Sequence, residues 1–401
     1  MNNVFDILIK PRTFWKLKVQ PAIVIWFIFA IRAVVLELSH GEKNLNNFLI
    51  YKYVFFHTIH QQNLYLEYPS QYLDSNHYGS LFSIIILPFA ILPIYAGYSF
   101  WGLLSSLFLF FAIEQLNFKK EYKMLILLIG IIELQRSIHE SQFNPITAGL
   151  IILSFTLIEK RNIFWAAFFI MTGFLVKLYG IVGICFICFS KDKLKLIYSL
   201  FFWFLVLYSL PMVISSPKFI VQSYGDWFEA LVHKNALNSD ILDLDFFQDI
   251  SVMGFIRRLF GFTNFPNMYV LMPALIFYII PFFRKDQHRY YSFRLSFLAL
   301  SLIGVVIFSS SAESSTYIIA SIGVGIWFIL ESNKKNFLAK TLLIFTFIVS
   351  SLFTNYVFPK IWVDQYFYRY SIKVVPYFFI WCILAIQLLR KDYSKADKNL
   401  F

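Results

Sequence analysis

The chain has 401 residues, of which 59% are hydrophobic and only 14% are charged. Soluble globular proteins are about 45–50% apolar and about 25% charged, so this composition excludes an ordinary water-soluble domain. A formal net charge of +12 would suggest a nucleic-acid partner in a soluble protein. Here the Lys and Arg residues stand in short clusters between apolar runs. We therefore expect an integral membrane protein surrounded by membrane lipids and without a nucleic-acid partner.

Twelve apolar runs have the character of membrane-spanning helices, and they predict an all-α, polytopic fold. Basic residues precede the first run and no small-residue cleavage site follows it, so we expect a retained first helix and not a signal peptide. The fifth and sixth runs are short and are also compatible with a re-entrant segment. The runs are 21–37, 96–116, 124–137, 145–158, 163–176, 178–189, 196–214, 267–283, 293–309, 316–331, 338–356 and 373–389.

One further apolar run, 80–93, is ambiguous because it has only 14 residues and contains two prolines. If this run is interfacial and does not cross the membrane, the connections on the inner side of the membrane hold 23 of the 35 Lys and Arg residues. The positive-inside rule then places both termini in the cytoplasm and the loops 38–95 and 215–266 outside. We therefore expect residues 1–401 to form a single domain in the plasma (inner) membrane, with an extracytoplasmic active site.

Motifs for nucleotide or metal chemistry are scarce. No inner connection is long enough for a nucleotide-binding domain, and neither a P-loop nor a dinucleotide fingerprint occurs, which argues against an ATP-driven pump and a nucleotide-sugar enzyme. Cys185 and Cys188 lie within an apolar run, where packing is the usual role. The Asp243-Leu244-Asp245 motif can hold a divalent cation, but such short acidic motifs often occur by chance. We expect no cofactor, and a divalent cation stays an alternative.

Residues 72–79 of the first outer loop place a carboxylate, an imidazole, an amide and two phenols just before an apolar run. One interpretation is a polar helix cap, with Asp74 or Ser75 at the N-cap. The other is a site in which Asp74 is a catalytic base and His77 contributes to donor binding. Both interpretations stay open.

A second polar stretch, QRSIHESQFNP at 135–145, opens another apolar run. A proline in the first turn is typical of a simple helix start, but Gln142 and Asn144 can also line a polar cavity, and Arg136 can bind a phosphate. Lys177 follows at the next outer turn. There it either extends to the membrane interface or marks a lipid-phosphate site.

Two further stretches contain candidate residues. Glu313 stands among small hydroxyl residues just before Tyr317, and we favour a catalytic site over a polar turn because nothing else explains a lone carboxylate there. Aromatic residues at helical spacing in the second outer loop predict an interfacial helix, in which Trp227 can stack on a sugar. We predict that Trp227 and Tyr317 bind the acceptor.

The order of several segments carries a family resemblance. The segments are NNFLIYKYVFF after the first span, Ser141-Gln142-Phe143-Asn144, Trp165-Ala166-Ala167 and Lys177-Leu178-Tyr179, and the resemblance extends over roughly residues 20–330. In this order the chain resembles glycosyltransferase family 87 within the GT-C superfamily. The resemblance implies a polytopic transferase that moves a hexose, often mannose, from a polyprenyl-phosphate carrier to a lipid- or glycan-linked acceptor at the outer face.

The resemblance also implies a catalytic carboxylate early in the first outer loop, where this chain has Asn46-Asn47. An amide cannot accept the proton, so either Asp74, Glu313 or Glu42 replaces it, or the chain is not an active transferase of that type. A departing phosphate needs positive charge or hydrogen-bond donors, which Lys177 can provide, and direct displacement inverts the anomeric carbon. The alternative is a transporter or lipid flippase without covalent chemistry, although no clear internal repeat supports it.

Overall fold

The computed structural model describes residues 7–14, 17–239, 249–263, 265–331, 336–352 and 359–395. Within these ranges nearly all regular structure is helical, as the predicted all-α class requires. The exception is a short antiparallel ladder between β1 (Arg12–Phe14) and β2 (Leu17–Val19), in which Arg12 pairs with Val19. This ladder directly precedes the first long apolar helix.

Three helical segments are long and apolar enough to cross a bilayer by length and composition, namely Pro21–Ser39, Ile94–Glu114 and Lys193–Val213. The remaining apolar helices are shorter. Each of the twelve predicted runs coincides with a described helix, although the end of the run 338–356 lies outside the described residues. How many of these helices span the membrane stays a prediction.

Apolar side chains cover the exposed faces of several helices. On α9 (Lys193–Ser209) Tyr198 is 72% exposed and Phe201 is 65% exposed, and on α12 (Met268–Ile279) no residue is buried. Apolar surfaces this extensive are unfavourable in water but are expected where the surrounding solvent is lipid. The apolar helices therefore indicate an integral membrane protein.

The chain forms two compact units, each built from segments that alternate along the sequence. Unit 1 contains residues 1–28, 116–136 and 235–401, and unit 2 contains residues 29–115 and 137–234. Neither unit is therefore a contiguous stretch of chain. Three helices contribute residues to both units: α2 (Pro21–Ser39), α6 (Lys120–His139) and α10 (Pro217–Ser239).

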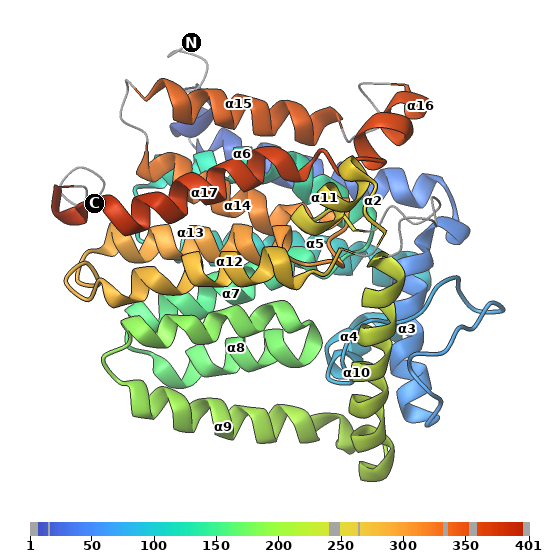
Figure 1. Cartoon of the computed structure of the whole chain (residues 1–401). Coiled ribbons are helices and arrows are strands. Elements are labelled where there is room, and N and C mark those ends of the chain that lie inside the picture. Colours follow the sequence, from blue (N-terminus) through green and yellow to red (C-terminus); the bar gives the residue numbers. More distant parts are fainter. Residues whose placement is uncertain are drawn as a thin grey trace. The chain divides into compact units, whose positions relative to one another are not determined.

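Unit 2 is arranged around the almost completely buried helix α7. Helices α7, α8 and α9 pack side by side in chain order, α5 also packs on α7, and α3 packs on α4 (Figure 1). The remaining elements of this unit are η1 (Glu42–Leu45), α3 (Asn46–Ile59), α4 (Phe82–Ala90), α5 (Ile94–Glu114), α7 (Asn144–Glu159), α8 (Ile163–Val176), η2 (Leu178–Phe189) and η3 (Leu210–Val213).

Two segments that were ambiguous in the sequence form short helices in unit 2. The run 80–93 contains only the nine-residue helix α4, with Pro88 inside it, which is too short to cross a bilayer. The segment 178–189 is the 3-10 helix η2, which folds back against α8. This close return requires glycine, because a Cβ on Gly180 would overlap the backbone of Gly173.

Unit 1 is centred on a buried hairpin of α13 and α14, against which α17 packs. Gly130 of α6 faces Ile322 of α14, so a small residue allows close helix contact. The elements of this unit are α11 (Val252–Phe260), α12, η4 (Ile280–Phe283), α13 (Tyr291–Ile307), η5 (Ser314–Thr316), α14 (Tyr317–Leu330), α15 (Phe337–Leu352), α16 (Lys360–Trp362), the π-helix η6 (Val363–Tyr368), α17 (Val374–Arg390) and η7 (Tyr393–Lys395).

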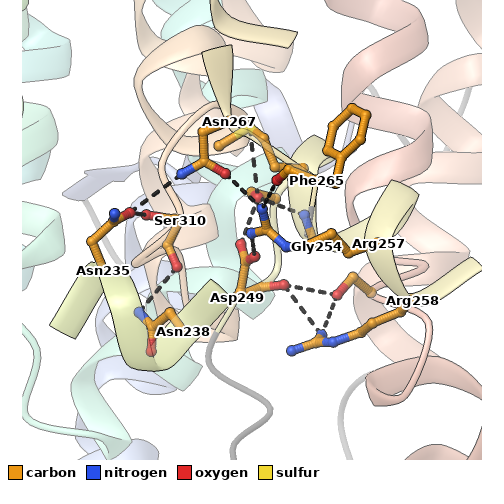
Figure 2. Close-up of polar contacts among 12 residues, drawn as sticks. Asn235, Asn238, Asp249, Gly254, Arg257, Arg258, Phe265, Asn267 and Ser310 are labelled. Atoms are coloured by element: carbon orange, nitrogen blue, oxygen red, sulfur yellow. Dashed lines mark hydrogen bonds and ion pairs between the residues drawn. The ribbon is translucent and has the colours of Figure 1, made fainter. Parts of the chain in front are cut away.

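A polar network organises the start of α11 in unit 1 (Figure 2). The Ser251 hydroxyl caps the helix by accepting from the Gly254 amide at 3.1 Å. Arg257 forms a buried ion pair with Asp249 and also donates to the Asn267 side chain at 2.6 Å, which fixes α11 to the start of α12. Because these groups bind one another and connect neighbouring elements, we interpret this network as structural.

Candidate functional site

Lys177 stands at the break between α8 and η2 in unit 2. Its backbone is extended, with φ −147° and ψ 116°, and this conformation ends the helix. The Nζ atom donates to the Asn144 side-chain oxygen at 2.8 Å. It also lies 5.6 Å from the centre of the Tyr78 ring and 5.0 Å from that of Tyr179. An ammonium group fixed between two aromatic rings and an amide is suited to an anionic ligand.

The SQFNP segment supplies the amides next to Lys177. Asn144 is the fully buried first residue of α7, and its Nδ2 lies 3.5 Å from the Gln142 side-chain oxygen. The Tyr78 hydroxyl donates to that same oxygen at 3.2 Å. Pro145 does occupy the first turn of α7, so the segment is both a helix start and part of this polar cluster.

The first loop reaches Lys177 through Gly79. The Gly79 amide donates to the Val176 carbonyl oxygen at 3.1 Å, at the end of α8. A Cβ at this position would overlap the Leu175 carbonyl oxygen, so only glycine allows the loop to approach so closely. Immediately before it, Asn76 bonds both the amide and the carbonyl of Tyr78 and thereby fixes the turn. The backbone thus holds Tyr78 beside Lys177.

Asp74, His77 and Lys234 form a second, looser cluster in unit 2. His77 Nε2 lies 4.0 Å from one Asp74 oxygen, and Lys234 Nζ lies 3.9 Å from the other. Both ring nitrogens of His77 are shielded from solvent and have no hydrogen-bond partner among the described residues. Burial, followed by the charge of Lys234, lowers the pKa of His77 to about 4, although Asp74 opposes this shift. The imidazole is therefore neutral at neutral pH.

Trp227 of α10 is bound to the same loop. Its indole Nε1 donates to the His77 carbonyl oxygen at 2.9 Å, and its ring lies against Gly79. The side chain is only 6% exposed. In this structure the indole therefore positions the His77 loop and is not an open platform for stacking.

Asn46 and Asn47, at the position where the family resemblance implies a carboxylate, bind backbone groups. Asn46 accepts from the Leu73 amide at 2.7 Å and donates to the Leu73 carbonyl oxygen at 2.8 Å. A carboxylate cannot make this pair of bonds because it has no donor when ionised. Asn47 donates to the Glu140 carbonyl oxygen at 2.9 Å. The two amides therefore connect the start of α3 to the residue before Asp74 and to the turn before Gln142.

The sequence interpretation did not identify Glu37 or Lys234. Glu37, near the end of α2, is buried, and its carboxylate lies 3.0 Å from His139 Nδ1. A carboxylate in an otherwise apolar helix is the signal that points to Glu37. No comparable signal marks Lys234, because its partner Asp74 lies far away in the sequence.

The other candidate residues belong to unit 1. Arg136 donates to the Tyr368 hydroxyl at 2.7 Å. Glu313 is the N-cap of η5 in a reciprocal capping box with Thr316, so the polar-turn interpretation describes its contacts. Tyr317 is fully buried, and its hydroxyl donates to the Ile250 carbonyl oxygen at 2.7 Å. These three residues therefore have structural contacts of their own within unit 1.

Lys373 forms a buried ion pair in the same unit. Its Nζ lies 2.7 Å from Glu133 of α6 and also donates to the carbonyl and hydroxyl oxygens of Ser314. Lys373 thereby links α6 to the turn that follows Glu313. Among the residues the structure describes, no three His, Cys, Asp or Glu side chains gather as a metal site would require. The predicted Asp243-Asp245 motif lies outside those residues.

One comparison with known proteins decides the class of the protein. The model of glycosyltransferase family 87 matches residues 76–352, well over half of the chain. The chain belongs to glycosyltransferase family 87. No curated protein matches it. This family 87 protein is thus a glycosyltransferase, which confirms the predicted family and enzyme class and decides against a transporter or flippase without covalent chemistry.

The family match includes most of the site described above. It begins at Asn76, so Asn47 and Asp74 precede it, whereas the Lys177 cluster and the candidate residues of unit 1 lie inside it. In unit 2 of the family 87 protein, the Lys177 ammonium group lies beside Tyr78, and the Asp74–His77 pair lies just before Tyr78 in the same loop. Such an arrangement can bind an anion at one end and transfer a proton at the other.

Proposed function

We propose that this glycosyltransferase moves a hexose, with mannose as the expected sugar, from a polyprenyl-phosphate carrier to a lipid- or glycan-linked acceptor. The observation that supports this proposal best is the Lys177 ammonium group, which Asn144 holds beside the Tyr78 ring. A phosphate monoester that leaves as an anion needs a fixed positive charge near its oxygens. Lys177 is suited to provide it, with Gln142 and Asn144 orienting the ammonium group.

Asp74 is proposed as the base. Its side chain is 45% exposed, next to the neutral imidazole of His77. The acceptor hydroxyl attacks the anomeric carbon, its proton passes to Asp74, and the bond between that carbon and the phosphate oxygen breaks. The polyprenyl phosphate leaves with the bonding electrons, and His77 can donate a hydrogen bond to the sugar or the phosphate. A single displacement of this kind inverts the anomeric carbon.

The proposed site lies on the extracytoplasmic face of the plasma (inner) membrane, with both termini in the cytoplasm. The charge pattern of the connections supports this orientation. A Ser75→Cys substitution, made in a variant without the cysteines at 185, 188 and 382, tests it. We expect a membrane-impermeant maleimide to label intact cells at position 75. Labelling only after the membrane is opened would contradict the orientation.

The proposed reaction is tested with purified protein in lipid, supplied with a labelled polyprenyl-phosphate hexose and a panel of lipid- and glycan-linked acceptors. We expect label to move to at least one acceptor, and to require Lys177. Transfer from a nucleotide sugar alone, or absence of transfer across the whole panel, would contradict the proposed donor. Movement of labelled lipid across the vesicle membrane without any product would likewise contradict the proposed reaction.

A further inference from the structure

Five side chains of unit 2 form one continuous chain of hydrogen bonds that ends at Lys177. The Tyr51 and Tyr78 hydroxyl oxygens lie 2.8 Å apart, and Tyr78 donates to Gln142 at 3.2 Å. The Asn144 Nδ2 lies 3.5 Å from the same Gln142 oxygen, and Lys177 donates to Asn144 at 2.8 Å. We name this set of five residues the tyrosine–amide chain. It connects α3 to the break between α8 and η2.

The donor and acceptor at each step of this chain follow from elementary chemistry. An ammonium group only donates, so the Asn144 oxygen accepts from Lys177 and the Asn144 nitrogen must face Gln142. The Gln142 oxygen then accepts from both Asn144 and Tyr78. Because Tyr78 uses its one hydroxyl hydrogen on Gln142, Tyr51 is the donor in the bond between the two phenols.

This directionality fixes the amide orientations. Rotating the Gln142 amide would bring its NH₂ group against the Asn144 NH₂ group, and rotating Asn144 would bring that NH₂ group against Lys177. Asn144 is fully buried and Tyr51 is 2% exposed, so water does not readily replace a lost bond. Loss of the Tyr51 hydroxyl would therefore act through Tyr78 and Gln142 on Asn144. Asn144 is the residue that holds the Lys177 ammonium group.

We propose that Tyr51 is a positioning residue for donor binding, acting through the tyrosine–amide chain on Lys177 without touching the substrate. This inference rests on the proposed function, because it assumes that Lys177 binds the donor phosphate. Lysine has a flexible side chain whose immobilisation costs entropy on binding. A network that fixes the ammonium group beforehand therefore improves donor binding. The four bonds of this chain include neither Asp74 nor His77, so we expect the acceptor step not to depend on it.

The test compares Tyr51→Phe with Tyr53→Phe. Each substitution removes one hydroxyl from helix α3, but Tyr53 is not part of the chain and its ring packs near Phe56 and His57. For Tyr51→Phe we expect kcat/KM for the polyprenyl-phosphate hexose to fall about fivefold, since one neutral hydrogen bond contributes about 1 kcal/mol. The acceptor KM should not change, and the melting temperature should fall by no more than the loss of one buried hydrogen bond allows. Tyr53→Phe should behave as the wild type.

A double-mutant cycle with Asn144→Ala separates positioning from general packing. If Tyr51 acts through Asn144, adding Tyr51→Phe to Asn144→Ala should cause less than a twofold further loss. An additive fivefold loss, or an equal loss in Tyr53→Phe, would overturn the inference. If the wild type neither transfers the hexose nor binds polyprenyl phosphate, the proposed function fails. If the wild type is active and Tyr51→Phe is unchanged, only the positioning role fails.

Discussion

The Gly79 amide donates to the Val176 carbonyl oxygen at 3.1 Å, and this contact brings the first loop to the end of α8. This contact also makes Tyr78 and Lys177 neighbours, because Tyr78 directly precedes Gly79 and Lys177 directly follows Val176. The geometry leaves no room for a side chain at position 79. The cluster around Lys177 therefore depends on a backbone contact as much as on the side chains that form it.

Gly79→Ala should displace the loop. The new Cβ would meet the Leu175 carbonyl oxygen and the Trp227 ring, and overpacking of this kind typically costs about 1–3 kcal/mol. We expect transfer activity to fall at least tenfold, measured with the labelled donor, together with a lower melting temperature. Gly225→Ala is the matched control, because a Cβ there meets nothing within 4 Å. Equal activity of the two variants would contradict the proposed loop contact.

Lys177→Met should remove the fixed charge and keep most of the side-chain volume. Losing one group that stabilises developing negative charge typically reduces the rate by about 10²–10³. We expect a loss of that size in kcat/KM for the donor, with weaker binding of polyprenyl phosphate. Lys160→Met is the control, because Lys160 bonds Gln115 on an exposed part of unit 2. An active Lys177→Met variant would remove Lys177 from the proposed site.

Asp74→Asn and Glu313→Gln test the two acids predicted from the sequence. Asp74→Asn should reduce turnover by about 10²–10⁴ if Asp74 is the base, and folding should not change because the carboxylate is partly exposed. Glu313 accepts a backbone bond as the cap of η5, so Glu313→Gln should cost only a few tenths to about 1 kcal/mol of stability. Melting and turnover of both variants check this. A large loss of turnover in Glu313→Gln, with normal turnover in Asp74→Asn, would instead identify Glu313 as the base.

The pKa of His77 predicts a pH-dependent stability. This pKa is about 4 in the folded protein, whereas an unperturbed histidine has a pKa of 6.5, so the unfolded chain binds the proton more tightly. Stability from this group is complete above pH 6.5 and is lost as the pH falls towards 4, by at most roughly 3 kcal/mol. The melting temperature of His77→Gln should therefore depend less on pH in this window. The exposed His60→Gln is the control, and equal slopes in all three proteins would contradict the prediction.

Local patterns predicted most of the helices, because apolar runs and proline positions are properties of short segments. The nine-residue α4 and the helix start at Asn144 are examples. The candidate residues of unit 2 were also recognisable one at a time, since polar groups next to apolar runs are conspicuous. What the sequence does not contain is the pairing between distant segments. Lys234 beside Asp74 and Glu37 beside His139 arise only from tertiary packing.

Asn46 and Asn47 show why a departure from a family pattern is hard to interpret from sequence. An amide where an acid is expected suggests a lost function. In the structure Asn46 makes a donor and an acceptor bond to Leu73 at the same time, which an ionised acid cannot do. The amides therefore hold the residue before Asp74 and the turn before Gln142 in place.

The anomeric configuration of the transferred sugar tests the central claim most directly. The claim is that Lys177 holds the departing phosphate while Asp74 takes the acceptor proton in a single displacement. NMR of the product formed from a polyprenyl-phosphate hexose of known configuration should show inversion, with product formation greatly reduced in Lys177→Met. Retention of configuration, or full product formation by Lys177→Met, would contradict the claim.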